Sequence, residues 1–85
     1  MVSAMMYETK MIQKILKEKT NNNLITIEKL HKIVMQEARV LNNFTIKKVI
    51  KAFELMGYIK IRMDGFFEVD IKTIEARLKE IEESG

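Results

Sequence analysis

The first half of the chain carries two runs in which apolar residues recur at helical spacing. In residues 4–19 lysines and glutamates flank one apolar stripe, which consists of Met5, Ile12, Ile15 and Leu16. Residues 27–39 repeat the pattern with Ile27, Leu30, Ile33, Val34 and Ala38. This spacing predicts two amphipathic helices. Between them, residues 24–26 favour a very short extended segment, and Thr26 is the expected N-cap of the second helix.

A third helix is predicted over residues 44–56. We expect Asn42 to take a left-handed turn before it and Asn43 to cap it, because asparagine tolerates that conformation and is a good cap. One face of this helix is apolar and comprises Ile46, Val49, Ile50, Phe53 and Met56. The other face carries Phe44, Lys47, Lys48, Lys51 and Leu55. Gly57 is placed to end the helix.

Residues 58–70 predict a β-hairpin, because apolar and polar residues alternate on both sides of Gly65. A two-residue turn at Asp64 and Gly65 would mix the two faces. A three-residue loop, Met63-Asp64-Gly65, keeps them consistent, as a type I turn with Gly65 left-handed in a bulge. The inner pairs are then Ile61 with Phe67 and Ile59 with Val69. The outer pairs are Lys60 with Glu68, Arg62 with Phe66 and Tyr58 with Asp70.

The last element is predicted to be a helix over residues 71–83, with Asp70 or Thr73 as its cap. Its apolar residues are spaced 3, 4 and 3 apart and form a short seam of Ile71, Ile74, Leu78 and Ile81. One interpretation is that this seam closes over the domain's own core. The other is that it forms a homodimer by packing against the first helix or its counterpart in a second chain.

Composition narrows the class of protein. Eighty-five residues, 47% of them hydrophobic, are enough for one small domain, and the chain has no cysteine for disulfides or thiolate metal sites. No apolar run approaches the roughly 18 residues of a membrane span, and the N-terminus does not resemble a signal peptide. We therefore expect a cytoplasmic protein without membrane contact.

Enzyme chemistry is not expected. The chain has a single histidine, His31, and serines only at positions 3 and 84. Neither a nucleophile with its base nor a set of metal ligands can be assembled from these residues. We expect no cofactor and no metal.

The net charge of +3 is unevenly distributed. Residues 44–63 carry five basic residues against Glu54 alone, whereas residues 64–85 carry seven acidic and three basic residues. Basic charge is thus concentrated on the third helix and the first strand of the hairpin. By itself this distribution is compatible with a solvated surface as well as with an anionic partner.

Residues 42–69, NNFTIKKVIKAFELMGYIKIRMDGFFEV, resemble the winged helix-turn-helix DNA-binding superfamily. The resemblance is carried by Ile46, Ile50 and Phe53 inside the third helix, followed by the Gly57-Tyr58-Ile59 step into the hairpin. It covers residues 5–70 and implies a mainly α fold with a small β-hairpin. That fold has a three-helix core, a wing and here an additional C-terminal helix. The turn before the third helix often holds glycine in this superfamily, whereas this chain has Asn42.

The resemblance implies sequence-specific binding of double-stranded DNA by a transcriptional regulator. The third helix would enter the major groove, and the wing at 58–70 would contact the backbone. The residues expected to meet DNA are Asn43, Phe44, Thr45, Lys47, Lys48, Lys51, Lys60 and Arg62. A homodimer would suit such a regulator, because reading two half-sites requires two copies.

Other interpretations remain open. The lysines of the third helix are also consistent with a solvated surface, and Phe44 with packing against protein. Winged helices also serve as protein–protein interaction modules of replication or transcription assemblies, and a weaker likeness is to the domains that end archaeal replicative helicases. In that case the contact surface would comprise Phe44, Leu55, Tyr58 and Phe66.

Overall fold

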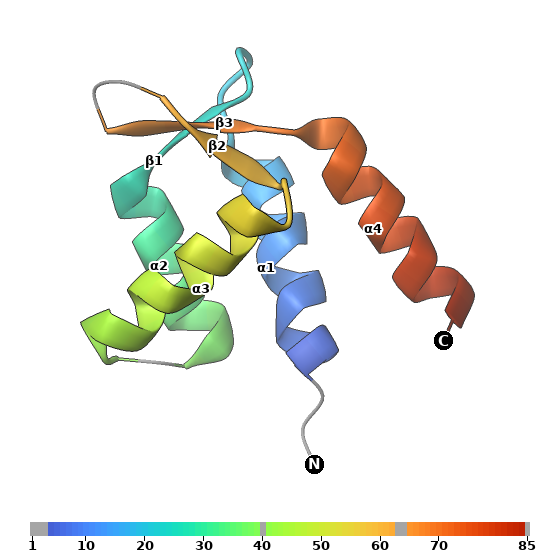
Figure 1. The fold of residues 1–85 in the computed structure, drawn as a ribbon, viewed down its shortest axis with the longest axis horizontal. Helices are drawn as coiled ribbons and strands as arrows, with labels where there is room; N and C mark the ends of the chain where they lie inside the picture. Colours follow the sequence, from blue (N-terminus) through green and yellow to red (C-terminus); the bar gives the residue numbers. More distant parts are fainter. Residues whose placement is uncertain (1–3, 40, 63–64, 85) are drawn as a thin grey trace.

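The structure, a computed structural model, describes residues 4–39, 41–62 and 65–84 (Figure 1). These residues form a mainly helical fold with one small antiparallel sheet. The elements in chain order are α1 (Ala4–Glu18), β1 (Leu24–Thr26), α2 (Ile27–Ala38), α3 (Asn43–Leu55), β2 (Ile59–Ile61), β3 (Phe66–Val69) and α4 (Ile71–Ser84). All the predicted helices and strands are therefore present, with ends shifted by one or two residues.

The sheet has the strand order β1-β3-β2 and lies across one end of the first three helices (Figure 1). The predicted hairpin register is confirmed, since Ile59 pairs with Val69 and Ile61 pairs with Phe67. The third strand is a finding that the sequence did not predict. β1 pairs with the far edge of β3, placing Ile25 opposite Phe67. The hairpin is thereby joined to the segment between α1 and α2.

Gly57 ends α3 with a left-handed backbone, at φ 85°, as predicted. The N–H of Gly57 donates to the carbonyl of Glu54, and the N–H of Tyr58 donates to the carbonyl of Phe53. These two hydrogen bonds form a Schellman motif, which satisfies the last helical carbonyls and packs the residue after the glycine back onto the helix. The rings of Phe53 and Tyr58 lie 5.6 Å apart between centroids.

Gly65 is also left-handed, at φ 73°, as the three-residue hairpin loop requires. The hairpin closes with a hydrogen bond from the N–H of Arg62 to the carbonyl of Phe66. The carbonyl of Gly65 accepts a hydrogen bond from the N–H of Ile27, which ties the hairpin to the start of α2. The predicted turn at Met63 and Asp64 lies outside the described residues, so its type stays a prediction.

The connection between α2 and α3 differs from the prediction. Arg39, the first residue after α2, takes the left-handed conformation at φ 55°. Asn42 is extended, at φ −79° and ψ 116°, and its side chain accepts hydrogen bonds from the N–H groups of Phe44 and Thr45. Asn42 is therefore the N-cap of α3, and Asn43 is its first helical residue. The left-handed residue thus lies three positions before the predicted Asn42, and the cap one position before the predicted Asn43. A cap needs extended backbone, so Asn42, as the cap, cannot take the left-handed turn.

The predicted caps of α2 and α4 can be read from their hydrogen bonds. The Thr26 hydroxyl accepts a hydrogen bond from the N–H of Lys29 at 3.1 Å and caps α2. The Asp70 carboxylate accepts one from the N–H of Thr73 at 3.0 Å and caps α4. Of the two candidates for the α4 cap, Asp70 is thus correct and Thr73 lies inside the helix.

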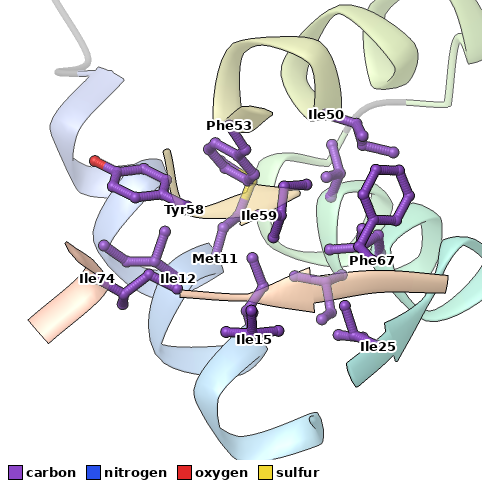
Figure 2. Close-up of a cluster of buried hydrophobic side chains, with 14 of the residues drawn as sticks. Met11, Ile12, Ile15, Ile25, Ile50, Phe53, Tyr58, Ile59, Phe67 and Ile74 are labelled. Atoms are coloured by element: carbon purple, nitrogen blue, oxygen red, sulfur yellow. The ribbon is translucent and has the colours of Figure 1, made fainter. Parts of the chain in front are cut away.

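One cluster of buried side chains, contributed by every helix and strand, forms the core (Figure 2). Its fully buried members include Ile12, Ile15, Ile25, Leu30, Val34, Ile46 and Ile74. Burying a side chain of this size contributes about 1.5–3 kcal/mol relative to leaving it exposed. The apolar stripes predicted for α1, α2 and α3 thus face one another, except that Ile27 and Met56 are exposed. The side chain of Met5 lies outside the described part of the chain.

In Figure 1, α4 runs beside α1, which lies between α4 and α2. Ile74 is completely buried in the core, and Ile71 and Leu78 pack against the core with part of their surface exposed. Ile81 is half-buried. The apolar seam of α4 therefore covers the chain's own core.

Candidate nucleic-acid interface

The orientation of α3 follows from its two faces. Ile46, Ile50 and Phe53 are buried and hold the helix against the rest of the domain, while Val49 is half-buried beside them. Because these residues recur every three or four positions, the intervening residues must point outward. The predicted apolar face is correct except for Met56, which follows the last helical residue and is exposed.

The outward face of α3 carries the residues that sequence analysis assigned to DNA. Lys47, Lys48 and Lys51 are exposed, and Phe44 exposes 66% of its surface. The Lys48 ammonium group lies 4.6 Å from the centroid of the Phe44 ring, a cation–π contact. The aromatic ring and the lysine therefore form one exposed feature at the N-terminal end of α3.

Not all of these charges are equally available to a partner. The Lys51 ammonium group lies 3.5 Å from the Glu54 carboxylate on the same helix. Lys47 makes no ion pair with any described residue. At the start of the helix Asn43 is exposed and Thr45 is half-buried. The strongest unpaired positive charge on this face thus lies at Lys47 and Lys48.

The hairpin presents the two remaining candidates, Lys60 and Arg62, and both are exposed. Lys60 lies opposite Glu68 in the strand register. The Arg62 guanidinium also reaches Glu68, with 3.4 Å between Nη1 and Oε1. The Glu68 carboxylate therefore partly offsets Arg62, whereas Lys60 makes no ion pair with any described residue.

The hairpin faces differ from the prediction at two positions. Ile61 was expected inside and is 63% exposed, because it is the last residue of an edge strand. Tyr58 was expected outside and is 3% exposed. Tyr58 precedes β2 and belongs to the Schellman turn, so the alternation of a strand does not govern it. Tyr58 therefore cannot contribute to an exposed contact surface.

Several large apolar side chains remain exposed on α3, on the residues that flank it and on the hairpin. Leu55 exposes 80% of its surface, and Leu41, Met56 and Ile61 each expose more than half. Phe66 is exposed to a smaller extent. Monomeric proteins often expose single apolar residues, whereas a contiguous apolar patch is typical of contact surfaces.

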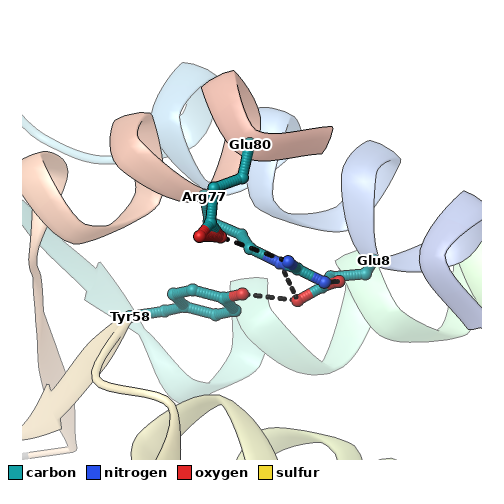
Figure 3. Close-up of polar contacts among 4 residues, drawn as sticks. All are labelled: Glu8, Tyr58, Arg77 and Glu80. Carbon is teal, nitrogen blue, oxygen red and sulfur yellow. Dashed lines mark hydrogen bonds and ion pairs between the residues drawn. The ribbon is translucent and has the colours of Figure 1, made fainter. Parts of the chain in front are cut away.

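Sequence reasoning missed a polar cluster that joins α1, the turn before β2 and α4 (Figure 3). Glu8 is 8% exposed, although it carries a carboxylate. The Tyr58 hydroxyl donates a hydrogen bond to Glu8 Oε2. Arg77 binds the same carboxylate through two nitrogens, with Nη2 at 3.1 Å from Oε1 and Nε at 3.4 Å from Oε2. Arg77 also reaches Glu80 at 3.3 Å.

The electrostatics of this cluster favour a neutral tyrosine. Burial, together with the hydrogen bond and the negative charge of Glu8, raises the pKa of Tyr58 to about 12. The hydrogen bond and charge of Glu8 also raise the pKa of the Arg77 guanidinium. At neutral pH Tyr58 is therefore a hydrogen-bond donor rather than a nucleophile, and the cluster is suited to holding helices together.

The cluster borders a cleft of about 550 Å³, which Met56, Thr73 and Ala76 also line. No buried polar side-chain atom among the described residues lacks a hydrogen-bond partner. In the same part of the chain no group of three or more His, Cys, Asp or Glu residues is arranged to hold a metal ion. No described helix combines the length and apolar character needed to cross a lipid bilayer.

Comparison with known proteins gives no relative for this chain: no family model matches it, and neither the curated proteins nor the solved structures contain a significant match. Functional inference therefore depends on the chain's own residues and their arrangement.

Proposed function

We propose that this chain is a winged-helix protein that binds double-stranded DNA and acts as a transcriptional regulator in the cytoplasm. In this proposal α1, α2 and α3 are the three-helix core, α3 is the recognition helix, and β2 and β3 form the wing. α4 is an addition to that fold.

The exposed face of α3 is the observation that carries the proposal. An α-helix with its side chains is about 10–12 Å across, and the major groove of B-DNA is about 12 Å wide. The outward residues of α3 include three exposed lysines, and the single acidic residue of the helix, Glu54, is engaged by Lys51. A presented helix of this charge is suited to the electronegative groove.

The residues have different roles in this proposal. Asn43 and Thr45, near the start of α3, are placed to contact base edges, and Phe44 to contact a thymine methyl group. Lys47 and Lys48 are placed to bind guanine or phosphate.

In the wing, Lys60 and Arg62 contact the sugar–phosphate backbone of the DNA beside the major groove. Because Arg62 is paired with Glu68 and Lys51 with Glu54, each must exchange a carboxylate for a phosphate. Lys47, Lys48 and Lys60 therefore contribute more to affinity.

Electrophoretic mobility shift at low salt tests this proposal, with genomic fragments as the probe and the exposed Lys79 of α4 as the control position. We expect Lys47→Ala/Lys48→Ala to weaken binding by about 1–3 kcal/mol for each lysine that contacts a base. The slope of log affinity against log salt should fall by about 1.8 if both bind phosphate. Lys79→Ala should change neither quantity. Absence of DNA affinity in the wild type at low salt would exclude the proposal.

A second candidate function, a protein–protein interaction module, is favoured by the exposed apolar residues. Leu55 and Phe44 lie on the outward face of α3, and Ile61 lies at the end of β2. A recognition helix contacts base edges through its N-terminal residues, so a leucine at its C-terminal end is not expected to contact DNA. Leu55→Lys distinguishes the candidates: it should leave DNA affinity unchanged or higher under the DNA proposal. A protein-binding module would lose its partner.

A homodimer is part of the proposal, because two half-sites require two copies. Ile74 is buried within one chain, so the outer surfaces of Ile71, Leu78 and Ile81 remain for a dimer seam on α4. Sedimentation of the wild type over a concentration range tests this directly. Ile81→Glu should shift the mass toward the monomer without unfolding the chain. A monomer at every concentration rules the dimer out.

A further inference from the structure

A second basic surface lies on elements that do not include α3 or the hairpin. It is formed by five lysines of α1 and α2, which we call the α1–α2 basic face: Lys10, Lys14, Lys17, Lys29 and Lys32. Lys10, Lys14 and Lys17 follow one another at helical spacing along α1 and therefore share one side of that helix. Lys29 and Lys32 share a side of α2 in the same way.

The fold brings the two sets of lysines together. α1 and α2 pack against each other through buried residues that include Ile12, Ile15 and Leu30. One surface cleft, of about 220 Å³, is lined by Lys10, Gln13, Lys14, Lys17 and Glu37. A second, of about 160 Å³, is lined by Lys14, Glu18, Lys29, Lys32, Ile33 and Gln36. Because Lys14 lines both, the clefts adjoin and form one continuous surface.

Most lysines of this surface are free to bind an anionic ligand. Lys10, Lys17, Lys29 and Lys32 are exposed, and none of them forms an ion pair with another described residue. Lys14 is paired with Glu37 at 3.6 Å. Five lysines against the two glutamates of the clefts leave a surplus of three positive charges on this face. The α1–α2 basic face therefore attracts anions independently of α3.

The spacing of the charges suits a nucleic-acid backbone better than an acidic protein. From Lys10 to Lys17 the helix rises about 10 Å, a length over which duplex DNA presents about six phosphate charges. Each exposed ion pair with a protein side chain contributes little, about 0–1 kcal/mol. A duplex, in contrast, releases condensed counterions at every neutralised phosphate. The side-chain amides of Gln13 and Gln36 add donors for phosphate oxygens.

We propose that the α1–α2 basic face binds the sugar–phosphate backbone of a second DNA duplex, so that one chain holds two DNA segments together. Binding at this face is independent of sequence, because lysines that contact phosphates carry no base information. The bridging of two segments rests on the proposed function, which assigns the first duplex to α3. Binding at the α1–α2 basic face does not.

A capture experiment tests this inference. A duplex of about 20 base pairs, or two helical turns, is immobilised on beads, and a fluorescent duplex of the same length is added with the protein. We expect the wild type to retain the fluorescent duplex on the beads. Lys10→Gln/Lys17→Gln should lose most of this capture while still binding a single duplex. Its salt slope for total binding should fall by about 1.8, since each phosphate contact contributes about 0.9.

The matched control is Lys72→Gln/Lys79→Gln, which removes the same charge from exposed positions of α4. It should leave capture unchanged, and circular dichroism should show the same helix content for both variants. An equal loss of capture in the control overturns the inference, because net charge alone would then explain the effect.

Lys47→Ala/Lys48→Ala separates this inference from the proposed function. If this variant loses all binding while Lys10→Gln/Lys17→Gln captures normally, the α1–α2 basic face binds no DNA and the inference is overturned. Bridging would then come from two associated copies that each hold one duplex through α3. If Lys10→Gln/Lys17→Gln loses single-duplex binding and the α3 variant does not, the face is supported and the assignment to α3 fails. Salt-sensitive self-association that is lost in Lys10→Gln/Lys17→Gln, without DNA capture, would show that this face docks on a second copy of the chain and would overturn the inference.

Discussion

Arg77 and Glu8 form a two-point ion pair that joins the last helix to the first, although 69 positions separate them in the sequence. The Glu8 carboxylate is almost completely buried and also accepts the hydrogen bond of Tyr58. A buried charge is tolerated only when it is paired and hydrogen-bonded. Arg77 therefore compensates the charge that α4 covers where it packs on α1.

Arg77→Met is expected to destabilise the protein, because it leaves the charge of Glu8 buried without its cation. Adding Glu8→Gln should restore part of the loss, since a neutral amide tolerates the site better than an unpaired carboxylate. The midpoints of urea unfolding measure both effects. Lys79→Met, at an exposed position of the same helix, is the control and should leave the midpoint nearly unchanged. A double variant no more stable than Arg77→Met would show that the pair does not act as a unit.

The raised pKa of Tyr58 predicts a loss of stability in alkali. In the unfolded chain the hydroxyl ionises near its ordinary pKa of 10.0, whereas in the folded protein it stays protonated to about 12. Below the lower value both states keep the proton and the stabilisation is complete. Between the two values only the unfolded chain loses its proton, so the free energy of unfolding falls as pH rises. The loss is about 3 kcal/mol across the interval.

Tyr58→Phe isolates this effect, because it removes the hydroxyl and keeps the ring beside Phe53. Unfolding of both proteins should be followed at a series of pH values from neutral to strongly alkaline. The stability difference between them should shrink by about 3 kcal/mol as Tyr58 titrates in the wild type. Curves that stay parallel over the whole range would contradict the prediction.

The two asparagines before α3 are expected to respond differently to alanine. Asn42→Ala should cost about 0.5–2 kcal/mol, because its side chain caps the N–H groups of Phe44 and Thr45. Asn43→Ala should cost almost nothing, since Asn43 is an exposed residue of the first helical turn. Chemical denaturation of the two variants gives the comparison. An equal loss of unfolding free energy in both variants would show that Asn42 is not the N-cap of α3.

The two faces of α3 can be tested by alanine substitutions of similar size. Ile46 is completely buried, so Ile46→Ala should lower the free energy of unfolding by about 2–5 kcal/mol. Leu55 is exposed, so Leu55→Ala should change it by less than about 0.5 kcal/mol. Thermal or denaturant unfolding measures both. A large loss at Leu55 would mean that a partner chain covers this residue.

Local sequence patterns were sufficient to predict the secondary structure. The apolar stripes of α1, α2 and α3, the capping residues Thr26 and Asp70, and the two left-handed glycines all act within a few residues of the chain. The hairpin register was also predictable, because a three-residue loop places Ile61 opposite Phe67 and Ile59 opposite Val69, whereas a two-residue turn would pair apolar with polar residues. Such features depend on short-range sterics and hydrogen bonds, which neighbouring residues supply.

The errors lie where a residue's neighbours come from elsewhere in the chain. Tyr58 was assigned to the outside from strand alternation, but its ring packs on Phe53 and its hydroxyl meets Glu8, 50 positions away. Ile61 pairs with Phe67 as predicted but is exposed, since it is the last residue of an edge strand. The outward residues of α3 were identified correctly because the buried side of a helix determines its exposed side.

The sequence by itself determined the helices, the strands, the hairpin register and the lysines that α3 presents, since each depends on periodicity and local hydrogen bonding. Only the tertiary structure decided that β1 completes the sheet, that Glu8, Tyr58 and Arg77 meet, and that the lysines of α1 and α2 form one face. These features join segments far apart along the chain. Their formation depends on how the core packs, and no local pattern encodes that packing.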